Sequence, residues 1–225
     1  MRDQSALREL AEDPTSRKKF LRMGGGGVAA SLAVFIAACG SSDDDQATTS
    51  QPKAESTTAP DTSGTEQFGK GDLGIANYAL TLEYLETEFY TRAAESGMLK
   101  GKVLETAKRF GSEEVKHVEA LTALITKAGG KPATQPKAKF PLEDEKAILE
   151  LAATVENLGA SAYLGQADKI ADKEILAAAL SIHSIEARHA AVLNEVTGKP
   201  PSPDAFAKPA TAAEVLKAVQ PFLVS

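Results

Sequence analysis

The sequence predicts an all-α fold, with four long helices in two antiparallel hairpins joined by a long crossover and a short fifth helix at the C-terminus. Two observations support this class. Apolar residues recur three and four positions apart over long runs, which is the period of an amphipathic helix, and no segment alternates as a strand does. Glycine and proline interrupt the pattern at a few places and divide it into runs of similar length.

The first 38 residues are typical of an export signal. A basic stretch, SRKKFLR, precedes an apolar run of about 16 residues, shorter than the ~20 that a membrane-spanning helix needs. Cys39 ends this run and is the only cysteine in the chain, so it has no disulfide partner within it. The tetrapeptide IAAC at residues 36–39 resembles the lipobox of bacterial lipoproteins. That resemblance implies that Cys39 is acylated and becomes the new N-terminus.

The same basic stretch resembles the twin-arginine export motif, with Lys18 where the second arginine is expected. The twin-arginine route carries folded cargo, which would suit a protein that is loaded with metal before export. The general secretory route remains open. Either route, together with the lipid anchor, implies an exported protein held at the cell membrane or envelope on its extracytoplasmic side.

Residues 39–67 are expected to form a disordered linker after the lipidated cysteine. Residues 40–66 contain no Val, Ile, Leu, Met, Phe or Tyr and cannot build an apolar core. The segment therefore suits a tether that holds a domain off the membrane. Removal of residues 1–38 would leave a net charge of −8. With no basic stripe and no interleaved aromatic residues, nucleic acid is not an expected partner.

About 158 residues remain from residue 68 onward, enough for one domain with its own core. The predicted helices cover residues 72–97, 101–128, 142–168 and 172–197. The first and last connections are a few residues long and predict antiparallel hairpins, whereas the middle connection of about 13 residues can run the length of a bundle. A capping box between Thr211 and Glu214 predicts the start of the short last helix.

The second and fourth runs carry the same polar pattern. One contains SEEVKHVEAL and the other SIEARHAAVL, so Ser, Glu, His and Leu recur at identical spacing. The first and third runs, with EYLETEFY and ENLGASAY, share Glu, Leu and Tyr. Matching glutamates are 73 residues apart in the first and third runs and 72 apart in the second and fourth. One hairpin is therefore repeated, with its polar residues in register.

Helix geometry places the repeated glutamates at one depth. The midpoint between Glu83 and Glu114 falls in the first turn, and the midpoint between Glu156 and Glu186 falls in the second. Residues equidistant from a hairpin turn lie side by side, and at ~1.5 Å per residue each glutamate is about 20 Å from its turn. The histidines three residues after Glu114 and Glu186 point from the same helix faces.

Such a layer inside a core of alanine and leucine predicts a metal site. A buried carboxylate costs several kcal/mol or more unless it is neutralised, paired or bound to a metal. Two divalent metal ions would balance four glutamates. Of the three histidines in the chain, two complete the repeated motifs.

A glutamate on each of two helices and Glu-x-x-His on each of the other two resembles the ferritin-like superfamily of di-iron and di-manganese carboxylate proteins. Its rubrerythrin and bacterial ferritin-like-domain branch is the most similar. The resemblance implies a ferritin-like four-helix bundle in residues 68–225. It also implies the metal ligands: Glu114 and Glu186 as bridges, His117 and His189 as terminal ligands, and Glu83 and Glu156 each capping one metal.

Some acidic residues compete for these roles. Glu86 lies one turn after Glu83 and is its rival, but its repeat counterpart is Gly159, so the symmetry favours Glu83. Most of the other acidic side chains are interpreted as parts of solvated helix faces; examples are Glu88, Glu95, Glu113 and Glu119.

Three further residues could support the site. Tyr90 and Tyr163 lie two turns past the first-run and third-run glutamates, and helical side chains lean back toward the N-terminus. They would hydrogen-bond the carboxylates or relay electrons; the alternative is that they are ordinary core tyrosines. His183 is one turn before Glu186 and is either an extra ligand or proton donor, or a histidine of the core or rim.

Carboxylate and imidazole ligands suit iron(II) or manganese(II), with iron expected first, whereas thiolate ligands would favour other metals. An iron pair implies an oxidoreductase that reduces peroxide or O2 or oxidises Fe(II). The single cysteine leaves no rubredoxin-like four-cysteine site, so turnover would need an external electron donor. A metal-binding protein without turnover and a stress-related structural module with a vestigial site are the alternatives. A homodimer is compatible with the sequence.

Overall fold

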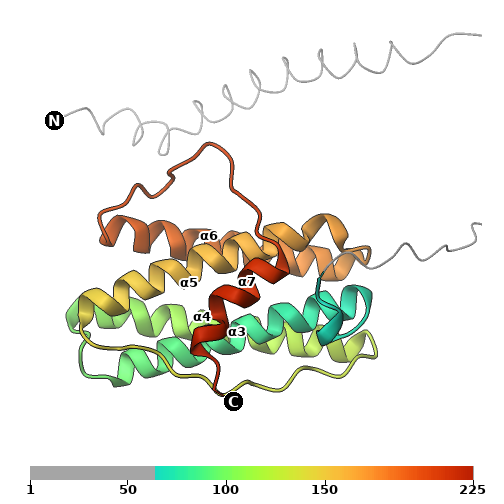
Figure 1. The fold of residues 1–225 in the computed structure, drawn as a ribbon, viewed down its shortest axis with the longest axis horizontal. Coiled ribbons are helices and arrows are strands. Elements are labelled where there is room, and N and C mark those ends of the chain that lie inside the picture. The colour runs from blue at the N-terminus through green and yellow to red at the C-terminus, as the bar shows by residue number, and fades with distance from the viewer. Residues whose placement is uncertain (1–63, 225) are drawn as a thin grey trace, which may run out of the picture. The chain divides into compact units, whose positions relative to one another are not determined.

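The computed structural model describes residues 64–224, and in them four long helices lie alongside one another with a short helix on the outside (Figure 1). The export signal, Cys39 and nearly all of the expected linker lie outside the described residues. The α-helices are α3 (Gly71–Glu95), α4 (Gly101–Lys127), α5 (Glu145–Gln166), α6 (Lys173–Val196) and α7 (Ala212–Val219). Short 3-10 helices cover Glu66–Phe68, Ala167–Lys169 and Gln220–Phe222. The described residues contain no β-strand, so the all-α fold class is confirmed.

The connections follow the predicted hairpin and crossover topology. α3 packs mainly on α4, and α5 packs mainly on α6. The long segment between α4 and α5 runs along the bundle (Figure 1). Asn77 on α3 fixes this crossover, because its side chain donates to the carbonyl oxygen of Lys131 and accepts from the backbone N–H of Ala133.

The helix starts are those that the sequence chemistry favours. The side chain of Asp144 accepts a hydrogen bond from the backbone of Ala147 at the start of α5, and Asp172 caps α6 in the same way. Thr211 and Glu214 form the predicted capping box of α7, which packs on α5. These side chains satisfy N–H groups that a helix start otherwise leaves without a partner.

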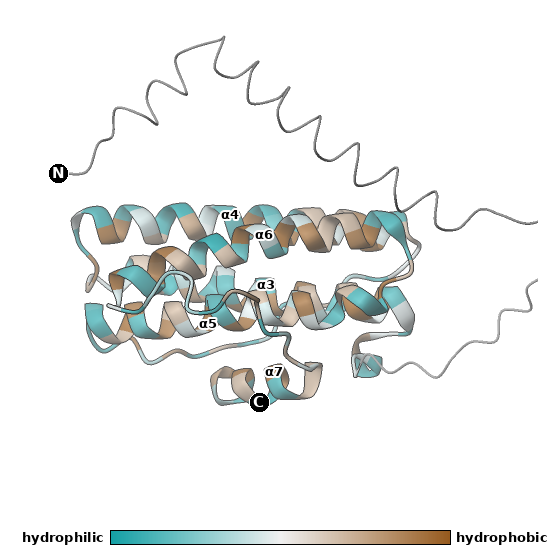
Figure 2. Ribbon diagram, turned by 90° about the horizontal axis from the view of Figure 1, so that it is seen from above, coloured by the Kyte–Doolittle hydropathy of each residue, from teal (hydrophilic) through white to brown (hydrophobic). Residues whose placement is uncertain are grey.

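Polar and apolar residues alternate in bands along the four long helices (Figure 2). The buried apolar residues form two clusters, one including Phe89 and Phe110 and the other including Leu80 and Leu121. The loop before α7 approaches α5 so closely that a Cβ at position 165 would lie 1.9 Å from the carbonyl oxygen of Ala210. Only glycine permits that contact.

The folded part begins slightly earlier than the sequence suggests. Thr65, which the sequence places in the linker, is completely buried, and a 3-10 turn follows it. The sequence did not predict this packing, because the segment that contains Thr65 has no large apolar side chain. Among residues 64–224, no helix combines the length and the apolar character that crossing a membrane requires.

Candidate metal centre

Six polar side chains from all four long helices meet at the centre of the bundle. The four glutamates are fully buried (0 % exposed): Glu83 on α3, Glu114 on α4, Glu156 on α5 and Glu186 on α6. Two histidines accompany them, His117 on α4 and His189 on α6, with 9 % and 2 % exposure. The residues that the repeat placed at one depth thus lie together.

The donor atoms of these residues form two groups. In the first group, Glu83, Glu114, His117 and Glu186 each offer an atom, and all four atoms lie within 4.8 Å of one another. His117 Nδ1 lies 2.7 Å from Glu114 Oε2 and 3.2 Å from both Glu83 Oε2 and Glu186 Oε1. Three carboxylates therefore surround one imidazole nitrogen.

The second group is the repeat counterpart of the first. Glu114, Glu156, Glu186 and His189 each offer an atom, again within 4.8 Å of one another. His189 Nδ1 lies 3.0 Å from Glu114 Oε1 and 3.3 Å from Glu156 Oε2. Glu114 and Glu186 belong to both groups, which is the arrangement expected of carboxylates that bridge two ions.

Several of these buried atoms make no well-aligned hydrogen bond among the described residues, although some lie 3.0–3.3 Å from an atom of opposite charge. They are Glu114 Oε1, Glu156 Oε2, both carboxylate oxygens of Glu186, and His189 Nδ1. Leaving a buried polar atom without a hydrogen bond costs about 1–3 kcal/mol, and more if it is charged. A cation within reach of these atoms would satisfy them together. The donor set of carboxylate oxygen and imidazole nitrogen thus fits divalent metal ions, and the cluster could hold them.

The imidazoles carry protons in the absence of such ions. Burial alone would lower the pKa of His117, but its hydrogen bonds to Glu114, Glu186 and Glu83 raise that pKa to about 12. Burial would likewise lower the pKa of His189, but the nearby carboxylates of Glu114 and Glu156 raise it to about 11. Burial would raise the pKa of Glu114, yet the two imidazoles lower it to about 2. Metal binding at these atoms would have to release protons.

The pKa values of two other carboxyl groups of the cluster, Glu83 and Glu186, shift in the opposite direction. Burial raises the pKa of Glu83 to about 7, against the lowering effect of its hydrogen bond from His117. Burial and the nearby Glu83 carboxylate raise the pKa of Glu186 well above its usual range. The site therefore holds some of its acidic groups in the protonated form at neutral pH.

Glu86 is a fifth buried carboxyl group. The sequence favoured Glu83 over Glu86 on symmetry, but both side chains point inward, and Glu86 is 3 % exposed. Space for it comes from Gly159 on α5, where a Cβ would lie 2.8 Å from Glu86 Oε1 and 3.2 Å from Glu186 Oε2. Burial and Glu186 raise the pKa of Glu86 well above its usual range. The absence of a side chain at Gly159 therefore leaves the space that the Glu86 carboxyl group occupies.

Glu113 corrects one interpretation made from the sequence. It was assigned to a solvated face, yet its Oε2 lies 2.6 Å from His189 Nε2. The neighbouring Arg109 approaches the other oxygen at 3.7 Å. Glu113 lies at the edge of the α4 face, and only the packing of α4 on α6 brings it to the histidine. The available signal in the sequence was the position of Glu113 directly before Glu114, a predicted metal ligand.

The two tyrosines reach across the bundle. The Tyr90 hydroxyl on α3 donates to Glu156 on α5, and the Tyr163 hydroxyl on α5 donates to Glu83 on α3. Each tyrosine therefore contacts the glutamate of the opposite hairpin. Burial raises the pKa of both phenols well above the usual range, so both remain neutral donors.

His183 lies outside both donor groups. Its Nδ1 is 3.0 Å from the carbonyl oxygen of Ala160 on α5, to which it donates a hydrogen bond. It is half-buried at the side of the bundle. This position favours the rim histidine over the extra ligand.

Comparison with known proteins agrees with the geometry. The model of the ferritin-like domain family matches residues 71–199, which include all six donor residues. The chain belongs to this ferritin-like domain family. No curated protein matches the chain.

Two solved structures are similar to this ferritin-like domain. One is a conserved hypothetical protein, rv2844, from Mycobacterium tuberculosis, with a TM-score of 0.52 and 17 % identity over 60 % of this chain and 96 % of that chain. The other is the hypothetical protein MJ0754 from Methanococcus jannaschii, with a TM-score of 0.43 and 14 % identity over 64 % of this chain and 91 % of that one. At this identity the first similarity supports the fold alone.

Proposed function

We propose that this ferritin-like domain binds two divalent metal ions, iron in preference to manganese, and uses them to reduce peroxide or O2 or to oxidise Fe(II). The observation that supports this most directly is the sharing of Glu114 and Glu186 between two donor groups. A vestigial site would be expected to lose members of the set, whereas all six are present and buried.

Each residue around the ions would have a definite task. The hydrogen bond between Glu113 and His189 Nε2 sets the tautomer of the ring and leaves Nδ1 for the metal. Tyr90 and Tyr163 hold the carboxylates of Glu156 and Glu83 by donating to one oxygen of each. Bound iron would supply one-electron chemistry shared between two ions. An external donor would have to return the electrons.

The test is to load the purified protein with Fe(II) without oxygen, remove free metal and measure iron by elemental analysis. About two ions per chain are expected, and manganese should bind more weakly. Mixing the loaded protein with peroxide in a stopped-flow instrument should give oxidation much faster than for Fe(II) in buffer. Two bound ions that peroxide and O2 leave unoxidised would favour a metal-binding protein without turnover. Absence of bound metal would refute the proposal.

We also propose that the protein is tethered to the cell envelope through acylated Cys39, exported by the twin-arginine or the general secretory route. The support is the lipobox-like IAAC sequence and the polar segment that follows it. Mass spectrometry of membrane-extracted protein should find a lipid on an N-terminal Cys39, and Cys39→Ser should release the domain. A soluble product that retains residues 1–38 would contradict this.

A further inference from the structure

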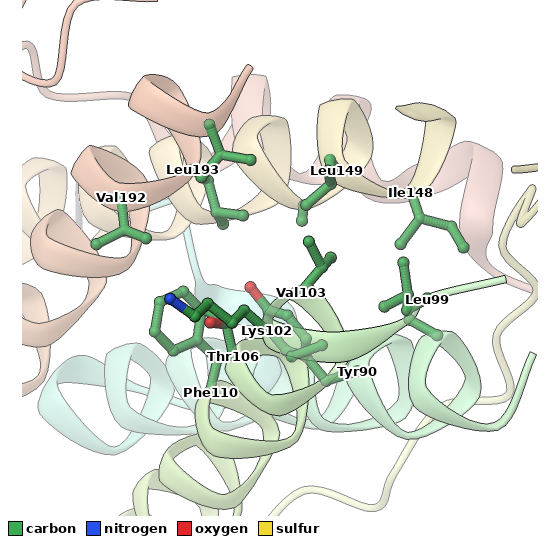
Figure 3. A pocket seen from close by; sticks show the side chains of 14 residues that line it. Tyr90, Leu99, Lys102, Val103, Thr106, Phe110, Ile148, Leu149, Val192 and Leu193 are labelled. Carbon is green, nitrogen blue, oxygen red and sulfur yellow. The ribbon is translucent and has the colours of Figure 1, made fainter. Parts of the chain in front are cut away.

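An apolar pocket opens beside the candidate metal centre (Figure 3). We call it the Tyr90 pocket. It has a cavity volume of about 130 Å³. In Figure 3, α4 side chains such as Val103 and Phe110 line one side, and Leu193, Leu149 and Ile148 line the other.

The repeat provides a built-in comparison for this pocket. A second cavity, the Tyr163 pocket, lies at the corresponding place in the other half and has a volume of only about 20 Å³. Eight lining residues of the two pockets correspond at the repeat offsets of 72 and 73 residues. The pairs are Tyr90 and Tyr163, Ala93 and Gln166, Val103 and Ile175, Ala107 and Ala179, Ile148 and Ile75, Leu149 and Ala76, Ala152 and Ala79, and Leu193 and Leu121.

The matched side chains do not by themselves account for this difference in volume. Ala93 and Val103 are smaller than their counterparts Gln166 and Ile175, but Leu149 is larger than Ala76 by a similar amount, so the packing of the two halves makes the difference. Apolar surface that no side chain covers forfeits packing contacts, which normally lowers the stability of a fold. One copy of a duplicated pocket has thus been left wide while the other is nearly filled, as expected if the wide copy accommodates a ligand.

The inner wall of the Tyr90 pocket touches the metal centre through two aromatic rings. The hydroxyl of Tyr90 donates to Glu156. The ring of Phe110 stacks on the imidazole of His189, with centroids 3.9 Å apart and an angle of 22° between the planes. A molecule in the pocket would therefore contact groups that position one metal ligand each.

The size and charge of the pocket define the ligand. A cavity of roughly 150 Å³ in another protein holds benzene, so this pocket suits a ring or a chain of about six carbons. The only charged side chain that lines it is Lys102, which is exposed and forms no ion pair with another residue of the described range 64–224. The exposed Val192 and Val196 also line the pocket, so it opens to solvent.

We propose that the Tyr90 pocket binds a small monoanionic amphiphile, with its aliphatic chain against Val103, Phe110 and Leu193 and its carboxylate on Lys102. The binding itself needs no metal. A role of this ligand as a substrate rests on the proposed function of the metal centre.

The test uses sodium hexanoate as the probe and the full chain as isolated, with its metal content measured on the same sample. Ligand-observed saturation-transfer NMR should detect binding with a Kd on the order of 1 mM, the range expected for so few atoms. Hexylamine should bind at least severalfold more weakly. Absence of hexanoate binding up to tens of millimolar would overturn the proposal.

The repeat supplies matched variants. Ala107 in the Tyr90 pocket and Ala179 in the Tyr163 pocket are both 7 % exposed. Ala107→Leu should weaken hexanoate binding at least tenfold, whereas Ala179→Leu should leave it within twofold. Val103→Phe, at a partly exposed position, serves as a second filling variant if Ala107→Leu is unfolded by circular dichroism. Unchanged binding in a folded filling variant would overturn the assignment to this pocket.

The head group has its own control. Lys102→Gln should weaken hexanoate binding about two- to fivefold, as expected for an exposed ion pair, and should leave 1-hexanol binding unchanged. Lys108→Gln, on the same helix but outside the pocket, should change neither. Equal effects of the two lysine variants would refute the role of Lys102. Hexanoate binding by protein that takes up no metal would separate this proposal from the metal centre, which alone would then fail.

Discussion

The two hairpins supply the same kinds of donor but surround them differently. Each provides one buried glutamate on its first long helix, one Glu-x-x-His motif on its second, and one tyrosine that donates to the first-helix glutamate of the other hairpin. Residues next to these donors differ between the two hairpins. Glu86 on α3 corresponds to Gly159 on α5, and Glu113 on α4 corresponds to Ile185 on α6.

These departures make the two donor groups chemically different. His189 has a carboxylate partner in Glu113 and an aromatic neighbour in Phe110. The counterpart of Glu113 that could serve His117 is Ile185, which cannot accept a hydrogen bond. A duplicated scaffold can therefore keep its ligands in register while the residues next to them diverge.

Substitution of the shared carboxylates, Glu114 and Glu186, should have the largest effect on metal binding, because both belong to both donor groups. Glu114→Ala or Glu186→Ala should reduce bound iron from about two ions per chain to less than one, as each carboxylate serves both groups. His117→Ala should remove mainly one ion. Elemental analysis after anaerobic loading measures this, with the exposed Glu119→Ala as control. A loss of only one ion in both glutamate variants would contradict bridging.

The surplus of buried acid in the first hairpin predicts how stability depends on pH without metal. The pKa values of Glu83, about 7, and of Glu86 are raised by burial, so the folded state keeps protons that the unfolded chain loses above about pH 4.5. The free energy of unfolding should fall as pH rises from about 5 through 7, by ~1.4 kcal/mol per pH unit for each such proton. The raised pKa values of His117, about 12, and His189, about 11, extend this fall above pH 6.5.

Urea unfolding at a series of pH values measures this slope. Glu86→Gln should make it shallower, since it removes one titrating group. Bound metal should raise stability because it binds the folded state preferentially. A metal-free protein that is equally stable at every pH would contradict the predicted titration.

The contact of Glu113 with His189 predicts a smaller effect on metal affinity, confined to one of the two proposed metal positions. Glu113→Gln removes the negative charge that holds His189 and should weaken metal at that position about 10- to 100-fold. The position at His117 should be unaffected. Metal titration should thus show two well-separated affinities in the variant, and Glu88→Gln on α3 is the control. Equal weakening of both positions would show that Glu113 acts on the whole site.

The pair of Glu86 and Gly159 gives the smallest effect. Gly159→Ala would place a methyl group 2.8 Å from Glu86 Oε1 and should cost roughly 1–3 kcal/mol of stability. Adding Glu86→Ala should recover much of this loss, because the crowded carboxylate is gone. A double-mutant cycle by chemical denaturation measures the coupling. Additive effects would mean that the two residues do not compete for the same space.

Much of the fold follows from local pattern. The period of the apolar residues places the four long helices to within a few residues, and the capping box at Thr211 marks the start of α7. The depth of Glu83, Glu114, Glu156 and Glu186 also follows, because a helix has a fixed rise and a short turn fixes the register of a hairpin. These properties depend on residues close in sequence.

Only the tertiary structure decides how one hairpin faces the other. The contacts of Tyr90 with Glu156, of Glu113 with His189 and of Glu86 with the space above Gly159 all join different hairpins. Their geometry depends on the rotation and separation of packed helices, which side-chain volumes across the whole interface determine. The sequence by itself therefore determined which residues share a layer and a face, and tertiary packing determined which of them touch.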